Sequence, residues 1–590
     1  MAPTTPATAS GLDDAPTWAD DGELDRFEAA VARFATDGED PETFRRLRIW
    51  HGVYGQRDSD AHMIRVKVPG GALAADALDA LADVCDRHGR GWGHVTTRQN
   101  VELHSVPLPD VVPALRRLAA GGLTSRESGG DTVRNVTACP LAGVCRTEVF
   151  DVSAATEVLA RHFLRNPLTQ SLARKFKIAL SGCAADCALA VIQDVGVIAA
   201  EREGRQGFRL VIGGGLGTDP RLAEPLEPLT DPRDLVVTVE ALLRVWDREN
   251  VDRTRRVHVR VRNLVQRLGA QAVREKVFAE RARLRCSATH RDGTPEQLIP
   301  PRRPRPSSPR HTDSAAAEVR AEVRAEVRAW IARCAVSQRQ PGLFAVHATT
   351  RLGDVTTTQW RALAAASREL GLTWRTTIRQ NLVALDVAEH HLPRLHALLS
   401  AAGLATCGEG TAAGIVSCPG TETCNRALTA SRGVAAATID ALFAAGLAQA
   451  PVTVNVSGCP NSCAQQQMAD IGLSGMIRRA CDAGAVEASG YRILLGGGSD
   501  TDGASLGRYV ARTVARRAPD AVVATVRRYL DERQDGEGFR TWMDRTGTAE
   551  VGAWLAPFDP LREPAVDPEL LTDLGPDSFR VAAARSECGA

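Results

Sequence analysis

Eight of the fourteen cysteines in this 590-residue chain form two sets with nearly the same spacing. In each set, two cysteines lie six residues apart, and two more that lie four residues apart follow further along the chain. The first set is Cys139, Cys145, Cys183 and Cys187, and the second is Cys418, Cys424, Cys459 and Cys463. Soft thiolates bind iron–sulfur clusters, zinc or copper(I). The six-residue step exceeds the roughly two to four intervening residues of zinc sites, which favours a 4Fe–4S cluster and leaves zinc and structural thiols as alternatives.

Two lysines in the segment ARKFKIAL give a second chemical signal. The chain has 72 Lys and Arg residues, and only Lys67, Lys175, Lys177 and Lys276 are lysines. Residues two apart on a β-strand face the same side, so we expect Lys175 and Lys177 to point together. An ammonium group binds an oxyanion and gives up a proton more easily than a guanidinium does. The pair predicts an anion site, and the alternative is two surface lysines at a strand edge.

The order of these features indicates an internal duplication. The tripeptide RQN occurs at residues 98–100 and again at 379–381. Both cysteine pairs, the acidic residues Asp194 and Asp470, and a run of glycines recur in the same order, with an offset of 276 to 283 residues. Five landmarks at a nearly constant offset predict two copies of one large unit.

Each copy has the same expected elements. Strand-like MIRVKVPG, helix-like ALDALADVCDRHG and strand-like WGHVTTRQNVELHSV in the first copy match GLFAVHAT, QWRALAAASRELG and TWRTTIRQNLVALDV in the second. A helix is expected between the cysteine pairs of each copy, followed by a strand that ends in SGC. The copies are separated by a Pro/Arg/Ser-rich segment and three AEVR units at residues 317–328. This composition predicts a solvent-exposed spacer.

Composition limits the class of protein. The chain is 44% hydrophobic and 24% charged, with a formal net charge of +1, so charge argues for neither a nucleic-acid nor a membrane partner. No apolar run reaches the roughly 18 residues of a transmembrane helix, and the N-terminus lacks a signal-peptide pattern. We therefore predict a cytoplasmic protein, in which cysteines serve metal or redox chemistry rather than a disulfide framework.

The sequence motifs around the cysteines are more specific than the cysteine spacing. SCPGTETCNRA, SGCPNSC and DIGL in the second copy, and GVYGQ, TTRQNVELH, VRNVTACPLAG and ARKFKIALSG in the first, resemble the sulfite and nitrite reductase family, which couples a siroheme to a 4Fe–4S cluster. The resemblance covers roughly residues 45–285 and 335–560. It implies an internally duplicated α+β fold, with two ferredoxin-like lobes and two siroheme/4Fe–4S-binding α/β lobes related by a pseudo-twofold axis.

The resemblance also implies a division into domains. The expected parts are an N-terminal extension (1–44), ferredoxin-like half-domain 1 (45–125), siroheme/cluster-type domain 1 with the anion pocket (126–286), a linker (287–330), ferredoxin-like half-domain 2 (331–405), 4Fe–4S/siroheme domain 2 (406–556) and a C-terminal tail (557–590).

Residue roles follow from the same resemblance. It implies that Cys418, Cys424, Cys459 and Cys463 hold the 4Fe–4S cluster, and that Cys463 also ligates the siroheme iron. Four first-copy residues match the anion-binding set of the family and are expected to be catalytic: Arg98, Arg134, Lys175 and Lys177. Gln99 and Asn100 of the TTRQN motif are expected to contribute to cofactor binding.

The two copies differ at the anion-binding positions. Ala413, Pro451 and Thr453 stand in the second copy where the first has Arg134, Lys175 and Lys177. We therefore predict one competent site, with its cluster from the second copy and its anion pocket from the first. The first cysteine set keeps the spacing of a cluster site, so a second 4Fe–4S cluster is expected there, with free thiols left from the duplication as the alternative.

The leading expectation is six-electron reduction of sulfite to sulfide. Electrons are expected from a small acidic ferredoxin, because no flavin or nicotinamide module is recognisable, and the enzyme is expected to be a monomer. The alternatives are a nitrite reductase, a precorrin oxygenase of the cobalamin pathway, a specialised-metabolism reductase of the same fold, and a non-enzymatic electron-transfer protein. In the family, nitrite enzymes often carry Asn at the position of Lys177, which favours sulfite.

Overall fold

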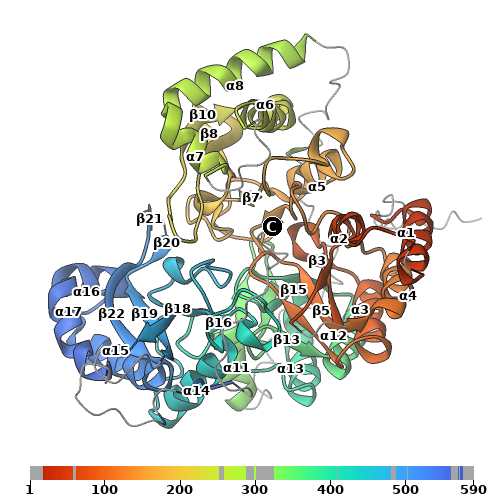
Figure 1. Ribbon diagram of the computed structural model, residues 1–590. Helices are drawn as coiled ribbons and strands as arrows, with labels where there is room; N and C mark the ends of the chain where they lie inside the picture. Colours follow the sequence, from red (N-terminus) through yellow and green to blue (C-terminus); the bar gives the residue numbers. More distant parts are fainter. Residues whose placement is uncertain are drawn as a thin grey trace, which may run out of the picture.

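The computed structural model describes residues 18–36, 38–57, 61–250, 258–286, 298–299, 325–406, 408–479, 487–500, 503–559, 569 and 572–575. They form three lobes that approach one another near the middle of the molecule (Figure 1). One lobe combines the first part of each half, and each of the other two carries one cysteine set. Most of the interhalf segment, including the AEVR units up to residue 324, lies outside the described residues.

The shared lobe contains two five-stranded antiparallel sheets that exchange strands. The first sheet has the order β1-β2-β5-β4-β13 and the second the order β11-β12-β15-β14-β3. The strands of the first sheet are β1 (Val53–Gly55), β2 (Ala61–Val66), β5 (Val101–Pro107), β4 (Trp92–Val95) and β13 (Asp354–Thr356). Those of the second are β11 (Ala335–Ser337), β12 (Leu343–Ala348), β15 (Leu382–Ala388), β14 (Thr373–Thr376) and β3 (Ala72–Leu73). Each half therefore completes the sheet of the other.

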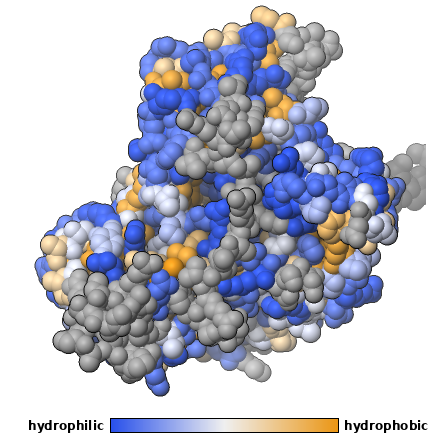
Figure 2. All heavy atoms as spheres, in the orientation of Figure 1, coloured by the Kyte–Doolittle hydropathy of each residue, from blue (hydrophilic) through white to orange (hydrophobic). Residues whose placement is uncertain are grey.

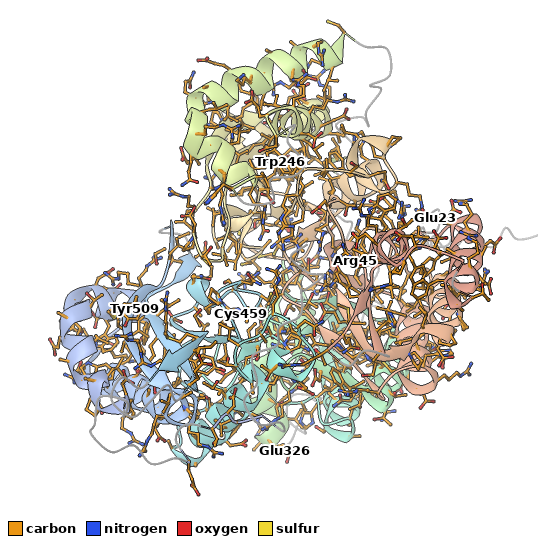
Figure 3. All side chains as sticks on the ribbon, in the orientation of Figure 1. Glu23, Arg45, Trp246, Glu326, Cys459 and Tyr509 are labelled. Carbon is orange, nitrogen blue, oxygen red and sulfur yellow. The ribbon has the colours of Figure 1, made fainter. Side chains whose placement is uncertain are left out.

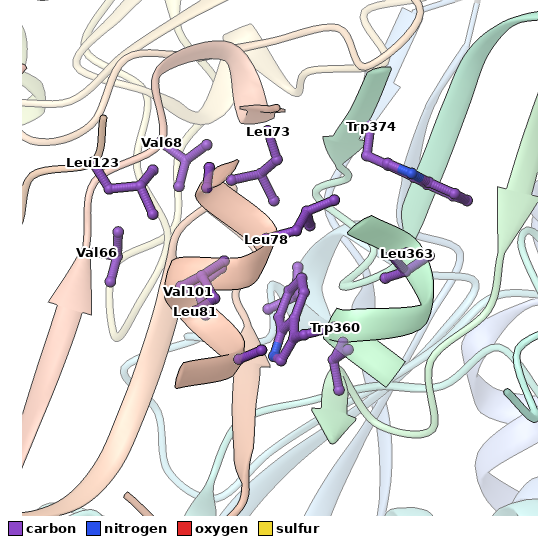
Figure 4. Packing of buried hydrophobic residues seen from close by; sticks show 14 of the residues in the cluster. Val66, Val68, Leu73, Leu78, Leu81, Val101, Leu123, Trp360, Leu363 and Trp374 are labelled. Carbon is purple, nitrogen blue, oxygen red and sulfur yellow. The ribbon is translucent and has the colours of Figure 1, made fainter. Parts of the chain in front are cut away.

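Helices pack between these two sheets and join the halves. The helices of this lobe are α3 (Ala75–Arg87), α4 (Leu108–Ala120), α12 (Thr357–Leu370), α13 (Leu392–Ala401) and α11 (Ala325–Cys334). Leu78 of α3 and Trp360 of α12 point toward each other in the core (Figure 4). Trp360 and Trp374 are fully buried. Burying aromatic surface of this size stabilises the contact between the halves by several kcal/mol, at about 25 cal/mol per Å².

The two cysteine-bearing lobes share one sheet plan. Their sheets have the orders β10-β9-β8-β7-β6 and β16-β17-β18-β19-β22. The first consists of β6 (Thr137–Ala138), β7 (Ile178–Ser181), β8 (Val195–Arg202), β9 (Arg205–Ile212) and β10 (Glu224–Thr230). The second consists of β16 (Val416–Ser417), β17 (Val454–Ser457), β18 (Ile471–Arg479), β19 (Glu487–Leu495) and β22 (Arg508–Val514). In both, the three strands nearest the cysteines are parallel and the others antiparallel.

Helices cover these sheets in matching positions. The first lobe has α5 (Ser153–Phe163), α6 (Leu235–Arg248), α7 (Val261–Leu268) and α8 (Ala270–Arg285), and the second has α14 (Ser431–Ala444), α15 (Ala518–Glu532), α16 (Phe539–Thr546) and α17 (Thr548–Leu555). Two further strands, β20 (Gly498–Asp500) and β21 (Gly503–Ser505), form a hairpin in the second lobe. Trp246 of α6 and Trp542 of α16 are each fully buried against their own sheets. Near the N-terminus, α1 (Asp21–Ala35) and α2 (Pro41–Trp50) pack against each other, and α1 packs on α4.

The backbone repeats its unusual conformations in both halves. Gln99 and Gln380 adopt left-handed φ values of 59° and 64°, and Leu189 and Gln465 adopt 50° and 57°. A non-glycine residue in this region is uncommon and is held there by its surroundings. Its recurrence at matching positions confirms the duplication, and the observed helices and sheets confirm the predicted α+β class.

The face in Figure 2 is largely hydrophilic, with small scattered apolar patches. Among the described residues, no helix is both long and apolar enough to cross a membrane. Cys334, at the end of α11, is disulfide-bonded, and it departs from the prediction that the cysteines serve metal or redox chemistry.

Candidate active site

The second cysteine set is assembled by two parallel strands. β16 ends at Ser417 and β17 ends at Ser457, and the two strands are hydrogen-bonded in parallel with Ser417 opposite Val456. Cys418 and Cys459 are the next residues after Ser417 and, beyond one glycine, after Ser457. Parallel neighbours place their carboxyl ends at the same edge, so both cysteine loops start side by side. Figure 3 shows Cys459 near the middle of the molecule, whereas Tyr509 of the same lobe lies at its periphery.

Backbone N–H groups point at the sulfur atoms of this set. The N–H of Gly458 donates to Cys418 Sγ at 3.2 Å, and the N–H of Arg426 donates to Cys424 Sγ at 3.4 Å. Such donors stabilise thiolates and tune the potential of iron–sulfur clusters. In the described residues, no three His, Cys, Asp or Glu side chains are close enough to hold a single metal ion. A four-iron cube places each thiolate on its own iron, so its ligands stand further apart.

Cys463 lies at the boundary between the two halves. Burial raises the pKa of its thiol, and the thiols of Cys418, Cys459 and Cys424 raise it further. Part of its surface is nevertheless accessible to solvent. Its thiol is therefore open to a ligand at the boundary between the halves.

A loop of the first half contacts the Cys463 loop directly. Thr97 Oγ1 donates to the carbonyl of Cys463 at 2.7 Å, and Gln465 Nε2 donates to the carbonyl of Thr97 at 3.3 Å. Arg98 is the next residue after Thr97, so these two hydrogen bonds fix the position of the first-half arginine loop on the second-half cysteine loop.

Arg98 is held by its own half of the chain. Its Nη1 donates to Gln193 Oε1 at 2.9 Å, its Nη2 donates to the carbonyl of Asn135, and Asn135 Nδ2 donates to the carbonyl of Arg98 at 3.0 Å. Its Nε is buried and has no partner. Burial, with the charge of Arg134, lowers the pKa of Arg98 to about 9. A buried donor without a partner is costly, which is the property expected of a group that binds a ligand.

Arg134 is fixed by backbone carbonyls. Its Nε and Nη2 donate to the carbonyl of Gly130 at 3.1 and 2.8 Å, and its Nη1 donates to the carbonyl of Ser128 at 3.0 Å. Three of its five N–H groups are thus used to orient the guanidinium.

Lys175 and Lys177 lie in the extended segment just before β7. Phe176 between them is fully buried and forms a bridge to Val133, so the two lysines share the opposite side of this segment, as predicted. Burial, followed by the charges of Arg134 and Arg260, lowers the pKa of Lys175 to about 7, and the Cys463 thiol opposes this shift. Burial, followed by the charge of Arg98, lowers the pKa of Lys177 well below its usual value. The electrostatic coupling links both lysines to the arginines and Lys175 to the second-half cysteine.

The structure adds Arg260 to this group, and sequence reasoning missed it. Arg260, at the start of α7, donates to both carboxylate oxygens of Asp194, from Nε at 3.1 Å and from Nη2 at 2.6 Å. The backbone N–H of Lys177 donates to the same carboxylate at 2.9 Å. Asp194 was recognised as a repeat landmark, but no local pattern marks Arg260, which lies 66 residues away.

Gln99 uses both ends of its amide on the protein backbone. Its Nε2 donates to the carbonyl of Thr376 at 2.8 Å, and its Oε1 accepts from the N–H of Ala138 at 2.8 Å. Gln99 therefore ties the arginine loop to the second half and to the first cysteine loop. Asn100, which was predicted with it, has a buried Oδ1 without a partner.

Comparison with known proteins places this geometry in a family. A model described as the nitrite and sulphite reductase 4Fe-4S domain matches residues 129–285 and 410–557, and one described as the nitrite/sulfite reductase ferredoxin-like half domain matches residues 54–121 and 336–402. The chain belongs to the nitrite and sulfite reductase family. It is an oxidoreductase, as predicted, and the family match supports an iron–sulfur cluster.

Some similar proteins are named sulfite reductase and others nitrite reductase. The chain is 30% identical to "Sulfite reductase [ferredoxin] 1" of Mycolicibacterium paratuberculosis, over 90% of this chain and 94% of that protein. It is 27% identical to the "Assimilatory ferredoxin-dependent nitrite reductase" of Haloferax mediterranei, over 91% of each. The solved structure of the Mycobacterium tuberculosis NirA protein matches with a TM-score of 0.74 and 28% identity, over 90% of this chain and 95% of that one.

The residues of the site fit the cofactors of this family. The second cysteine set offers four thiols and N–H···S donors to a cluster. Siroheme carries many carboxylates and needs a roomy site with cations around it. The solvent-accessible thiol of Cys463 and the cationic Lys175 that interacts with it fit such a group.

Proposed function

We propose that this enzyme reduces sulfite to sulfide with electrons from a ferredoxin. The observation that carries the proposal is the group of first-half cations beside Cys463 of the second half: Arg98, Arg134, Lys175 and Lys177, with Arg260 behind them. Asp194 is the acidic group coupled to these cations, and Arg260 already neutralises it. The site therefore has a net positive charge, which suits a small oxyanion with more than one negative charge.

The cations have separable roles in this proposal. Arg98 and Arg134, which are oriented by carbonyls and side chains, would bind and orient the oxyanion through N–H groups that the protein leaves available. Lys175, with a pKa near neutrality, would hold a proton at Nζ and release it to an oxygen that leaves as water. Lys177, whose pKa is lowered by burial and by the charge of Arg98, would gain its positive charge when the oxyanion binds beside it. When bound, siroheme with its coupled cluster would supply the electrons at the iron.

The protein residues that would hold these groups are already close together. Cys418, Cys424, Cys459 and Cys463 would hold the cluster, and Cys463 would ligate the siroheme iron from the side of the second half. The hydrogen bond from Thr97 to the Cys463 carbonyl would keep the cation loop at a fixed position relative to that ligand. The relatives named above as ferredoxin-dependent support ferredoxin as the electron donor.

The proposal is tested by anaerobic turnover with a reduced viologen dye on siroheme-loaded enzyme. We expect kcat/KM for sulfite to exceed that for nitrite by at least about tenfold, equivalent to about 1.4 kcal/mol of transition-state binding. Lys177→Asn should remove most of this preference. Lys276→Asn is the matched control, because Lys276 pairs with Glu249 on the surface and lies in α8, away from the cation group. A preference for nitrite in the wild-type enzyme would overturn the sulfite proposal.

Nitrite reduction is the second candidate. It is supported by relatives named nitrite reductase at similar identity, among them the Haloferax protein. It predicts that Lys177→Asn leaves the nitrite rate unchanged or raises it. Turnover of neither anion would point to the precorrin oxygenase or to another oxyanion.

A further inference from the structure

The first cysteine set is built into its lobe in the same way as the second. β6 ends at Ala138 and β7 at Ser181, and these strands pair in parallel with Ala138 opposite Leu180. Cys139 follows the first strand and Cys183 the second, and both cysteines are buried. The strand arrangement alone thus brings the two cysteine pairs of the first half to one sheet edge.

The four thiols of this set lie close to one another. Thr147 Oγ1 is 3.3 Å from Cys145 Sγ and 3.8 Å from Cys183 Sγ, so one hydroxyl links the two pairs. Cys139 interacts electrostatically with Cys187 and Cys145, and Cys183 interacts with Cys187 and Cys145. All four side chains therefore face one volume.

The second half braces the loop between the first two of these cysteines. Arg375 Nη1 donates to the carbonyl of Ala142 at 2.7 Å and to that of Pro140 at 3.2 Å. Gln340 Nε2 donates to the carbonyl of Gly143 at 2.9 Å, and the N–H of Arg339 donates to the carbonyl of Val144 at 2.8 Å. In the second set, Arg57 of the first half binds the Thr421 carbonyl at 2.9 Å in the corresponding loop. A loop fixed from both sides holds its thiols ready for a ligand.

From this geometry we propose that Cys139, Cys145, Cys183 and Cys187 hold a second 4Fe–4S cluster. Soft thiolates in a set of four are the ligands such a cluster takes. The cysteine spacing within each pair, the strand ends and the bracing from the other half match those of the second set, which the family match associates with a cluster. The proposal does not depend on whether the substrate is sulfite or nitrite.

The surroundings of this second cluster do not reproduce the anion site. Arg379, the counterpart of Arg98, interacts with Cys187, but its Nε is 3.8 Å from a carboxylate oxygen of Glu409. Ala413, Pro451 and Thr453 replace the other three cations. This face is therefore close to neutral. The second cluster would accept one electron from the reduced ferredoxin and pass that electron to the cluster of the second set, without binding an oxyanion.

The experiment counts acid-labile sulfide per chain after anaerobic reconstitution of the full-length protein with iron and sulfide. Each 4Fe–4S cluster contributes about four sulfides, and siroheme iron does not enter this count. We expect about eight in the wild type and about four in Cys145→Ser/Cys187→Ser. The surface thiol variant Cys286→Ser is the matched control and should stay at about eight. A wild-type value of about four that the first-half variant does not change would overturn the proposal, as would stoichiometric zinc in place of cluster iron.

A second variant keeps the test independent of folding losses in the first lobe. Cys424→Ser/Cys459→Ser removes only second-half ligands. After chemical reduction, this variant should still give the electron paramagnetic resonance signal of a reduced 4Fe–4S cluster, with about four sulfides per chain. Loss of that signal in protein that keeps the wild-type unfolding transition would show that the first set holds no cluster. Because the readout is spectroscopic, it is separate from the turnover test of the proposed function.

Discussion

At the scale of single residues, the site depends on a group of partly buried cations. Arg98, Arg134, Lys175 and Lys177 could be proposed from their motifs, since each lies within a few residues of a recognisable landmark. Arg260 could not, because its role arises from a contact with Asp194 across the lobe. Because of that contact, the negative charge of Asp194 is already neutralised by Arg260. It therefore does not cancel the positive charge of a lysine in the site.

The lowered pKa of Lys175 leads to a prediction about pH. Burial and neighbouring arginines bring this pKa to about 7, so the side chain is charged below that pH and loses its charge as the pH rises through it. Binding of the oxyanion should weaken accordingly. In Lys175→Arg the charge persists at all accessible pH values. We expect the ratio of wild-type KM to variant KM to rise above about pH 7, by up to about tenfold per pH unit.

The measurement is steady-state turnover of one anion by both enzymes across this pH range. Because both enzymes are assayed with the same anion, protonation of the anion itself does not affect the ratio of the two KM values. Lys276→Arg serves as the control and should give a constant ratio. A constant ratio for Lys175→Arg as well would show that Lys175 does not titrate in the working enzyme.

At the scale of elements, the exchanged strands require glycine at two matching positions. Gly71 has a φ of 80° beside β3, and Gly353 has a φ of 84° beside β13. A Cβ on Gly71 would lie 2.5 Å from the carbonyl oxygen of Thr376 and 2.7 Å from Gln99 Nε2. These two atoms form the hydrogen bond from Gln99 to Thr376 that ties the arginine loop to the second half. Strand exchange and the geometry of the site therefore both depend on this glycine.

Gly71→Ala should therefore destabilise the protein in two ways. The left-handed φ alone costs an L-residue about 1–2 kcal/mol, and the clash with a backbone carbonyl adds about 1–3 kcal/mol. Gly204→Ala isolates the first effect, because Gly204 has a φ of 73° and its Cβ would have nothing within 4 Å. Urea unfolding should give a clearly lower midpoint for Gly71→Ala than for Gly204→Ala. Equal midpoints would mean that the β3 connection relaxes without cost.

Sequence periodicity and repeats were sufficient to predict the strands and helices of each half. They were not sufficient to predict that the halves exchange strands. The strand and helix order of each half, the SGC strand ends and the paired lysines before β7 all follow from local patterns. The pairing of β3 with β14 and of β13 with β4 involves segments about 300 and about 260 residues apart. A two-residue strand such as Ala72–Leu73 has no periodicity that could indicate its partner, so tertiary packing decides it.

At the scale of the whole molecule, the duplication produced one active site from two unequal halves. Each cysteine lobe is completed by an arginine loop of the other half, through Thr97 and Cys463 on one side and through Arg379 and Cys187 on the other. Only one of the two combinations keeps the full set of cations. On both proposals the chain would have two cluster positions and one position for an oxyanion, and two self-contained halves would not give that arrangement.

This interdependence predicts that neither half folds alone. Each shared-lobe sheet lacks an edge strand without the other half, and the joint core around Leu78 and Trp360 would be exposed to water. We expect fragments 1–310 and 311–590 to be insoluble or unfolded when expressed singly, and to form a one-to-one complex with native circular dichroism when expressed together. Size-exclusion chromatography and cluster content of the co-expressed pair measure this. A single fragment that is monomeric, cooperative in unfolding and able to bind a cluster would show that the halves are autonomous, and that strand exchange is a docking contact rather than a condition for folding.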